Sequence, residues 1–127
     1  MSVAKKVQLN ELSGGAIDYL RNRGISKETA EKAGVKSASH WIQALQKETD
    51  CIFFPYLNQG QEYAQKIRSI EAKGFSCNGA PQTFFNIQNV QRDDWLIIVE
   101  GEMDALALME VGYESAVSVP NGAVMKV

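Results

Sequence analysis

The sequence is poor in the residues that build disulfide and zinc scaffolds. Its 127 residues include two Cys and one His. Two Cys cannot form a disulfide framework, and two Cys with one His fall one ligand short of a closed zinc tetrahedron. We therefore expect no zinc in this chain and two reduced thiols, Cys51 in a buried strand and Cys77 in a loop, as in cytoplasmic proteins.

Long apolar runs and an excess of charge of one sign are also missing. An apolar run such as Trp95 to Val99 is far shorter than the ~20 residues that span a membrane. The first ten residues lack the apolar core of a signal peptide, so we expect no membrane association. Thirteen basic and fifteen acidic residues give a net charge of −2. This balance excludes a histone-like binder, but a local basic stripe can still bind nucleic acid.

What the sequence does contain is typical of a folded globular domain, with 45% hydrophobic and 22% charged residues. After a flexible segment over residues 1–12, short helices are predicted. Ser13 begins a helix that ends near Gly24, and a second runs from Ser26 to Ala33. A third is predicted over Ser39 to Lys47, where Trp41 shares an apolar stripe.

Strands are predicted from residue 50 onward. Cys51–Leu57 and Gln61–Ile70 flank the turn signal Asn58-Gln59-Gly60 and form an antiparallel hairpin. Three further segments follow: a turn at Lys73-Gly74, a loop over Ser76–Pro81 and a short strand over Thr83–Ile87.

The last third predicts a strand, a helix and a second, parallel strand. The apolar run Trp95–Val99 is typical of a strand buried on both faces. A helix over Met103–Val111 and a strand over Ala116–Val119 complete a βαβ unit with a right-handed crossover. The fold class is therefore α+β, with a small helical and antiparallel-sheet subdomain followed by the first βαβ unit of an α/β fold.

Three carboxylates crowd the turn after the first strand of this unit. Glu100 is placed at the strand end, Asp104 falls in the first turn of the helix, and Glu102 lies between them. Gly101 lets the chain turn, and Asn121-Gly122 follow the second strand at the same sheet edge. Hard oxygen ligands suit Mg²⁺ or Mn²⁺. Acids also cap helices without any ligand, but capping does not require an acid at Glu100.

Basic residues gather on the second strand of the predicted hairpin. Lys66 and Arg68 fall on one face because side chains alternate along a strand, and Lys73 follows at the turn. Such a pair is a candidate phosphate contact. The alternative is an edge strand that charge protects from aggregation.

The acidic turn carries a family resemblance. The run from Leu96 to Leu106, which contains V-E-G-E-x-D-x-L, and the later S-V-P-N-G-A are similar to the first half of a Toprim domain. Among Toprim proteins they most resemble primase–helicases of phages and the Twinkle helicase. The resemblance makes Glu100 and Asp104 catalytic metal ligands, and Lys66 and Arg68 contacts to nucleotide phosphates or template. It implies a primase core subdomain over residues 13–90 and a truncated Toprim domain over 91–127.

The resemblance implies a function for the complete protein, namely Mg²⁺-dependent synthesis of RNA primers on single-stranded DNA. Its partners would be single-stranded DNA, ribonucleoside triphosphates and a helicase domain in the same chain or in a separate protein. It would act in the cytoplasm of a bacterial cell, and its gene could belong to a phage or prophage. The second acidic motif of the family, D-x-D, is absent, since no Asp follows Asp104. We therefore expect the isolated chain to be inactive.

Two other readings stay open. The region could be a non-catalytic single-stranded-DNA-binding module of a Twinkle-like helicase. It could also belong to a Toprim nuclease or topoisomerase, although the subdomain with Lys66 and Arg68 argues against that.

Overall fold

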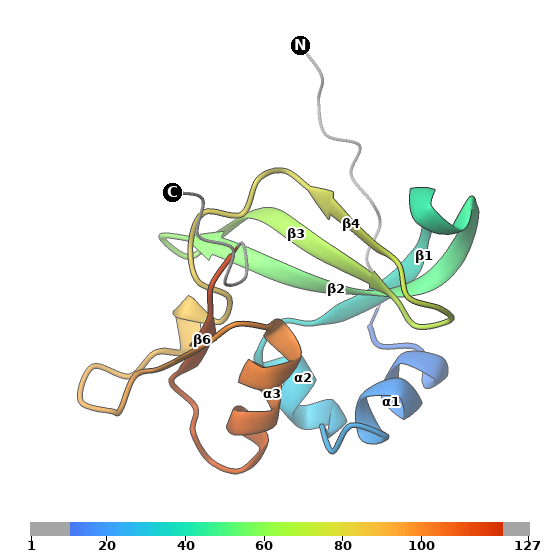
Figure 1. Cartoon of the computed structure of the whole chain (residues 1–127). Helices are drawn as coiled ribbons and strands as arrows, with labels where there is room; N and C mark the ends of the chain where they lie inside the picture. The colour runs from blue at the N-terminus through green and yellow to red at the C-terminus, as the bar shows by residue number, and fades with distance from the viewer. Residues whose placement is uncertain (1–10, 121–127) are drawn as a thin grey trace.

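A computed structural model describes residues 11–120. A four-stranded antiparallel sheet lies on one side of the molecule and the three α-helices lie against one of its faces (Figure 1). The elements in chain order are α1 (Gly14–Arg21), α2 (Lys27–Lys32), β1 (Lys36–Ile42), β2 (Lys47–Asn58), β3 (Gln61–Ser69), β4 (Phe75–Asn78), β5 (Ile97–Val99), α3 (Glu102–Glu110) and β6 (Ala116–Ser118). The predicted α+β fold class is confirmed. No helix within residues 11–120 is long and apolar enough to cross a membrane.

The first two helices have the predicted bounds because serine caps and glycine stops define them. The hydroxyls of Ser13 and Ser26 accept hydrogen bonds from backbone N–H groups three residues later. Gly24 and Gly34 have φ values of 78° and 80°. The residue after each glycine donates its N–H to the carbonyl five residues earlier, which closes the helix.

The predicted helix over Ser39–Lys47 is wrong. Residues 36–42 form β1, which pairs antiparallel with β2, and a single 3₁₀ turn over Gln43–Leu45 joins the two strands. Trp41, on the supposed buried stripe, is 47% exposed. The apolar spacing fits a helix and a strand equally well, and the long β2 provides the backbone partners that decide for the strand.

Two other predictions in the sheet region need correction. The expected loop over Ser76–Pro81 begins with β4, which pairs with β3. The expected strand over Thr83–Ile87 contributes only Phe85, which forms an isolated bridge to Ser118. Asn86 then takes a left-handed conformation with φ 69°, which ends the extended backbone.

The βαβ unit is confirmed, since β5 and β6 pair in parallel. The strand β5 is shorter than predicted, and it is not buried on both faces. Trp95 is 83% exposed and Ile98 52% exposed, because β5 pairs only with β6 among the described residues.

One hydrophobic core joins the two predicted subdomains. Its fully buried members include Leu20 from α1, Tyr56 from β2, Phe85 from the linker between β4 and β5 (residues 79–96) and Leu106 from α3. Leu12 is also buried in this core, so the predicted flexible segment over residues 1–12 is wrong at Leu12. The sheet and the βαβ unit therefore share one interior.

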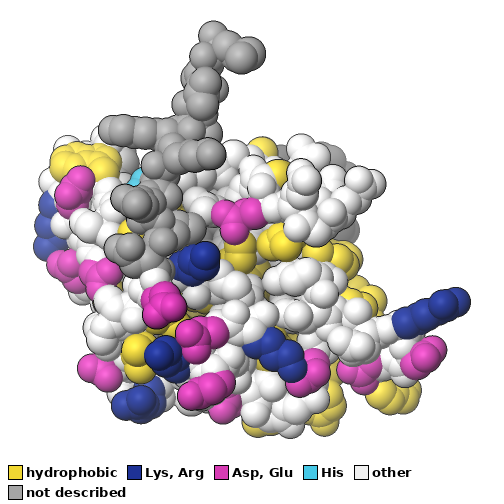
Figure 2. Space-filling model, turned by 180° about the vertical axis from the view of Figure 1, so that it is seen from behind, with side chains coloured by type: hydrophobic (Ala, Val, Ile, Leu, Met, Phe, Trp, Pro, Cys, Tyr) yellow, Lys and Arg dark blue, Asp and Glu magenta, His cyan; other side chains and the backbone are white. Residues whose placement is uncertain are grey.

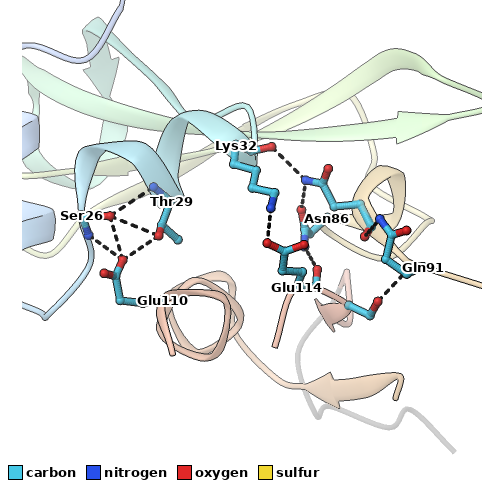
Figure 3. A network of polar contacts seen from close by, with 9 residues as sticks. Ser26, Thr29, Lys32, Asn86, Gln91, Glu110 and Glu114 are labelled. Atoms are coloured by element: carbon cyan, nitrogen blue, oxygen red, sulfur yellow. Dashed lines mark hydrogen bonds and ion pairs between the residues drawn. The ribbon is translucent and has the colours of Figure 1, made fainter. Parts of the chain in front are cut away.

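Polar contacts fasten the βαβ unit to α2 and to the linker (Figure 3). One carboxylate oxygen of Glu110 accepts hydrogen bonds from the Ser26 backbone N–H, from its hydroxyl and from the Thr29 hydroxyl. Lys32 forms an ion pair with Glu114, and the Asn86 amide donates to the Ala116 carbonyl at 2.9 Å. These contacts hold the C-terminal end of α3 and the start of β6 against α2 and the linker.

Candidate functional site

A groove of about 470 Å³ opens between the sheet and the beginning of α3. The sheet side is formed by Phe54, Lys66, Ile67, Arg68, Phe75, Ser76 and Cys77, and the helix side by Gly101, Glu102, Met103 and Asp104. The basic pair and most of the acidic turn, more than 30 residues apart in the sequence, thus face one space.

Register explains why the two cations point into this groove. Lys66 pairs with Phe54 on one side and Cys77 on the other, and Arg68 pairs with Ile52 and Phe75. Paired residues share a face of the sheet, and this is the face that α3 covers. Because β3 is an inner strand between β2 and β4, protection of an exposed edge does not explain its charges.

Glu102 is held in place rather than free. Its Oε1 accepts a hydrogen bond from the Tyr56 hydroxyl at 3.0 Å and lies 3.2 Å from the Lys66 ammonium nitrogen. The side chains of Lys66 and Glu102 are 24% and 14% exposed. This contact ties the basic strand to the acidic turn.

Tyr56 is the buried member of this cluster. Its side chain is fully buried, and its ring lies 6.0 Å from the ring of Phe85. Burial, and then the negative charge of Glu102, raise the pKa of the Tyr56 hydroxyl well above its usual value. The hydroxyl therefore stays protonated and donates its hydrogen bond to Glu102.

The other two carboxylates are exposed. Glu100 follows the last residue of β5 and does not line the groove, whereas Asp104 does. No group of three His, Cys, Asp or Glu side chains within residues 11–120 is arranged to hold a metal ion. Glu100 and Asp104 retain the donor chemistry for Mg²⁺, but the shared oxygen of Glu102 is occupied by Tyr56 and Lys66.

Gly101 does not have the role predicted for it. Its φ of −124° and ψ of 152° are open to any residue. A Cβ there would lie 3.4 Å from Asp104 Oδ2, which is ordinary contact. Gly101 lines the groove beside Asp104.

Lys73 lies apart from the other two predicted phosphate contacts. It lines a second hollow of about 330 Å³ with Tyr19, Arg23 and Arg68. Arg23 stacks on the Tyr19 ring at 3.7 Å, and Arg68 lies 5.9 Å from the same ring. Arg68 thus borders both hollows. Asn121 and Gly122 lie outside the described residues.

Sequence reasoning missed Phe75 and Cys77, which line the groove, and the buried Tyr56, which donates a hydrogen bond to Glu102. One signal could have found Tyr56, because a tyrosine in an otherwise apolar strand needs a partner for its hydroxyl. Because side chains alternate along a strand, Tyr56 lies on the same face of β2 as Phe54.

The groove differs in charge pattern from the back of the molecule. Seen from behind, Lys and Arg side chains lie interspersed with Asp and Glu side chains over the described surface (Figure 2). In the groove the opposite charges come from separate elements, with cations on β3 and carboxylates at the start of α3.

The fold resembles that of solved primase fragments. The chain is 27% identical to the primase fragment of the bacteriophage T7 primase-helicase protein, with a TM-score of 0.66 over 97% of this chain and 52% of that one. The zinc-binding and RNA polymerase domains of the Aquifex aeolicus primase share the fold, with a TM-score of 0.69 at 16% identity over 89% of this chain and 38% of that one.

Curated relatives agree with the structures. The chain is 31% identical over 121 residues to a chloroplastic/mitochondrial Twinkle homolog protein of Arabidopsis thaliana, and 30% identical over 122 residues to a primase homolog protein of the same plant. These matches cover 95% and 94% of the chain but only 16% and 34% of the relatives' lengths. No family model matches. The predicted resemblance to primases and Twinkle-like proteins is confirmed.

Proposed function

We propose that this chain is part of a DNA primase and that its groove binds the phosphates of a ribonucleoside triphosphate. The observation that carries the proposal is the meeting of Lys66 and Arg68 with the acidic turn in one groove. Likeness to a primase fragment of a primase-helicase protein supports it. The complete protein would make RNA primers on single-stranded DNA with a helicase domain as partner. The complete protein would act in the cytoplasm of a bacterial cell, and its gene could belong to a phage or prophage.

Arg68 is the first phosphate contact in this proposal. It forms none of the ion pairs found among residues 11–120 and lies 5.4 Å from the ring of Phe75 at the groove wall. A guanidinium without a carboxylate partner is ready to form charge-assisted hydrogen bonds with a phosphate. Lys66, two residues along the same face, is the second contact.

The carboxylates Glu100 and Asp104 would hold Mg²⁺ or Mn²⁺. Both are exposed at the turn, and neither forms a side-chain hydrogen bond or ion pair within the described residues. When bound, Mg²⁺ supplies positive charge that neutralises a triphosphate and favours an attacking hydroxyl. Two exposed carboxylates hold such an ion weakly, since Mg²⁺ keeps several waters and relies on substrate phosphates.

The test of phosphate binding is calorimetric titration of the chain with ATP and Mg²⁺. Replacing Arg68 by Ala is expected to weaken binding about tenfold, the effect of losing one charge-assisted contact. Arg92→Ala removes the same charge from an exposed position that does not line the groove and serves as the control. Equal affinities of wild type and Arg68→Ala would contradict the proposal.

The test of catalysis needs a longer protein that contains this chain. There, Glu100→Gln is expected to abolish primer synthesis and leave binding of single-stranded DNA intact, because the change removes a charge without changing size. Primer yield equal to that of the wild type would refute the catalytic role.

A second candidate is a DNA-binding module without priming activity. Similarity to a Twinkle homolog protein favours it, and a DnaG primase catalytic domain of the same fold was solved bound to single-stranded DNA. The same longer protein separates the two candidates, since this second one retains DNA binding, makes no primer and is indifferent to Glu100→Gln.

A further inference from the structure

The two groove cations differ in their surroundings. Lys66 is already paired with Glu102 at 3.2 Å, whereas Arg68 forms no ion pair among residues 11–120. Two residues along a strand span about 7 Å, and a lysine ammonium moves on a flexible stem. A phosphate held by Arg68 therefore lies within reach of Lys66, but Lys66 must leave Glu102 to bind it.

Leaving Glu102 has a cost that Tyr56 reduces. The Glu102 side chain is only 14% exposed, and a poorly solvated carboxylate without a partner is unfavourable. The Tyr56 hydroxyl bonds to the same oxygen, Oε1, that faces Lys66. When the ammonium departs, this oxygen keeps one donor, and the remaining hydrogen bond strengthens because the carboxylate is no longer neutralised.

We propose that Tyr56 is a positioning residue for phosphate recognition, whose hydroxyl holds the Glu102 carboxylate so that Lys66 can exchange that carboxylate for a bound phosphate. This inference rests on the proposed function. Tyr56 suits the role because its ring is fixed in the core beside Phe85, so the hydroxyl does not follow Lys66. The 5.5 Å distance from the Lys66 nitrogen to the Tyr56 ring shows that all three groups lie together.

The experiment measures binding of inorganic tripolyphosphate to the full chain in EDTA, so that no metal ion takes part. Tyr56→Phe removes only the hydroxyl and is expected to weaken binding about three- to tenfold, a part of the worth of a hydrogen bond to a charged group. Tyr63→Phe is the matched control, since its hydroxyl contacts Thr83 and it does not line the groove.

Glu102→Gln supplies the second arm. Without the carboxylate, Lys66 is released in advance, so binding is expected to tighten about threefold or more. It must tighten more than in Asp104→Asn, which removes one charge from the groove without touching Lys66. In the Glu102→Gln background, Tyr56→Phe is expected to have no effect, which a merely structural loss would not reproduce.

Each outcome is decisive. Wild-type affinity in Tyr56→Phe overturns the inference and leaves the proposed function standing. An equal loss from Tyr56→Phe in both backgrounds also overturns it, because the hydroxyl then acts independently of Glu102. No binding of tripolyphosphate by the wild type overturns the inference, and the titration with ATP and Mg²⁺ then decides the proposed function separately. If Tyr56→Phe does not fold, Glu102→Gln against Asp104→Asn decides alone, and equal affinities there refute the exchange.

Discussion

Replacing Phe85 by Ala should destabilise the whole fold rather than one part of it. The Phe85 side chain is fully buried, with its ring 5.7 Å from Phe54 and 6.0 Å from Tyr56. Its backbone exchanges hydrogen bonds of 2.9 and 3.3 Å with Ser118. The residue thus joins β2 to β6 although it belongs to no regular strand.

The expected magnitude follows from burial. Truncating a buried phenylalanine to Ala costs about 3–5 kcal/mol, against a total stability of roughly 5–15 kcal/mol for a domain. Phe85→Leu keeps most of the apolar volume and should cost about 1–2 kcal/mol. Phe75→Ala deletes the same ring at a position that is 56% exposed and should cost no more than about 1 kcal/mol.

Urea unfolding followed by circular dichroism measures these differences. Hydrogen exchange then tests whether one core is shared, since Phe85→Ala should weaken protection in β2 and in α3 together. A loss below about 1 kcal/mol would refute the reasoning. So would a variant in which α3 and β6 lose protection while the four-stranded sheet keeps it, because the two parts would then fold separately.

Three other predictions test the groove and its supports. Cys77 is exposed and lines the groove, whereas Cys51 is buried and burial raises the pKa of its thiol. N-ethylmaleimide should therefore modify Cys77 alone, and saturating ATP should slow that modification. An unchanged rate of modification would contradict binding in this groove. Hydrogen bonds from Thr29 and Ser26 lower the pKa of Glu110, so the Glu110 carboxylate stabilises the fold fully above its ordinary pKa of 4.5, and this stabilisation is lost as pH falls through the lowered pKa. The urea midpoints of the wild type and of Glu110→Gln should therefore differ at neutral pH and converge in acid. A difference that does not change with pH would refute this. Mg²⁺ should shift the amide resonance of Gly101 only at millimolar concentrations, because Glu102 is already bound to Tyr56 and Lys66. Micromolar affinity for Mg²⁺ would contradict this reasoning.

Local patterns in the sequence predicted most elements but misjudged those that depend on a partner. The Asn58-Gln59-Gly60 turn, the serine-capped helices and the βαβ unit each rest on signals within a few residues. The strand β1 was missed because Trp41 fits a helical stripe until β2 is present to pair with it. The strand β4 was missed because it has only four residues and ends at the turn signal Asn78-Gly79.

The candidate site shows the same division. Alternation along one strand correctly placed Lys66 and Arg68 on one face, because that relation is local. The separation of Lys73 from them, and the capture of Glu102 by Tyr56, depend on how the sheet packs against α3. No spacing within either segment encodes a contact between residues 46 positions apart, so the carboxylate seemed free to bind metal.

The basic and acidic residues, which lie far apart along the chain, bear on function only because this packing brings them together. A net charge of −2 says little about function, since cations on β3 and carboxylates at the start of α3 nearly cancel. The fold sets them across one groove, where Glu102 neutralises Lys66 and leaves Arg68 unpaired among the described residues. An anion that enters the groove therefore meets the unpaired Arg68, whereas Lys66 can bind it only after leaving Glu102. We expect a ligand with several phosphates to bind more tightly than a single anion, because one phosphate can contact Arg68 while the next contacts Lys66 on its flexible stem.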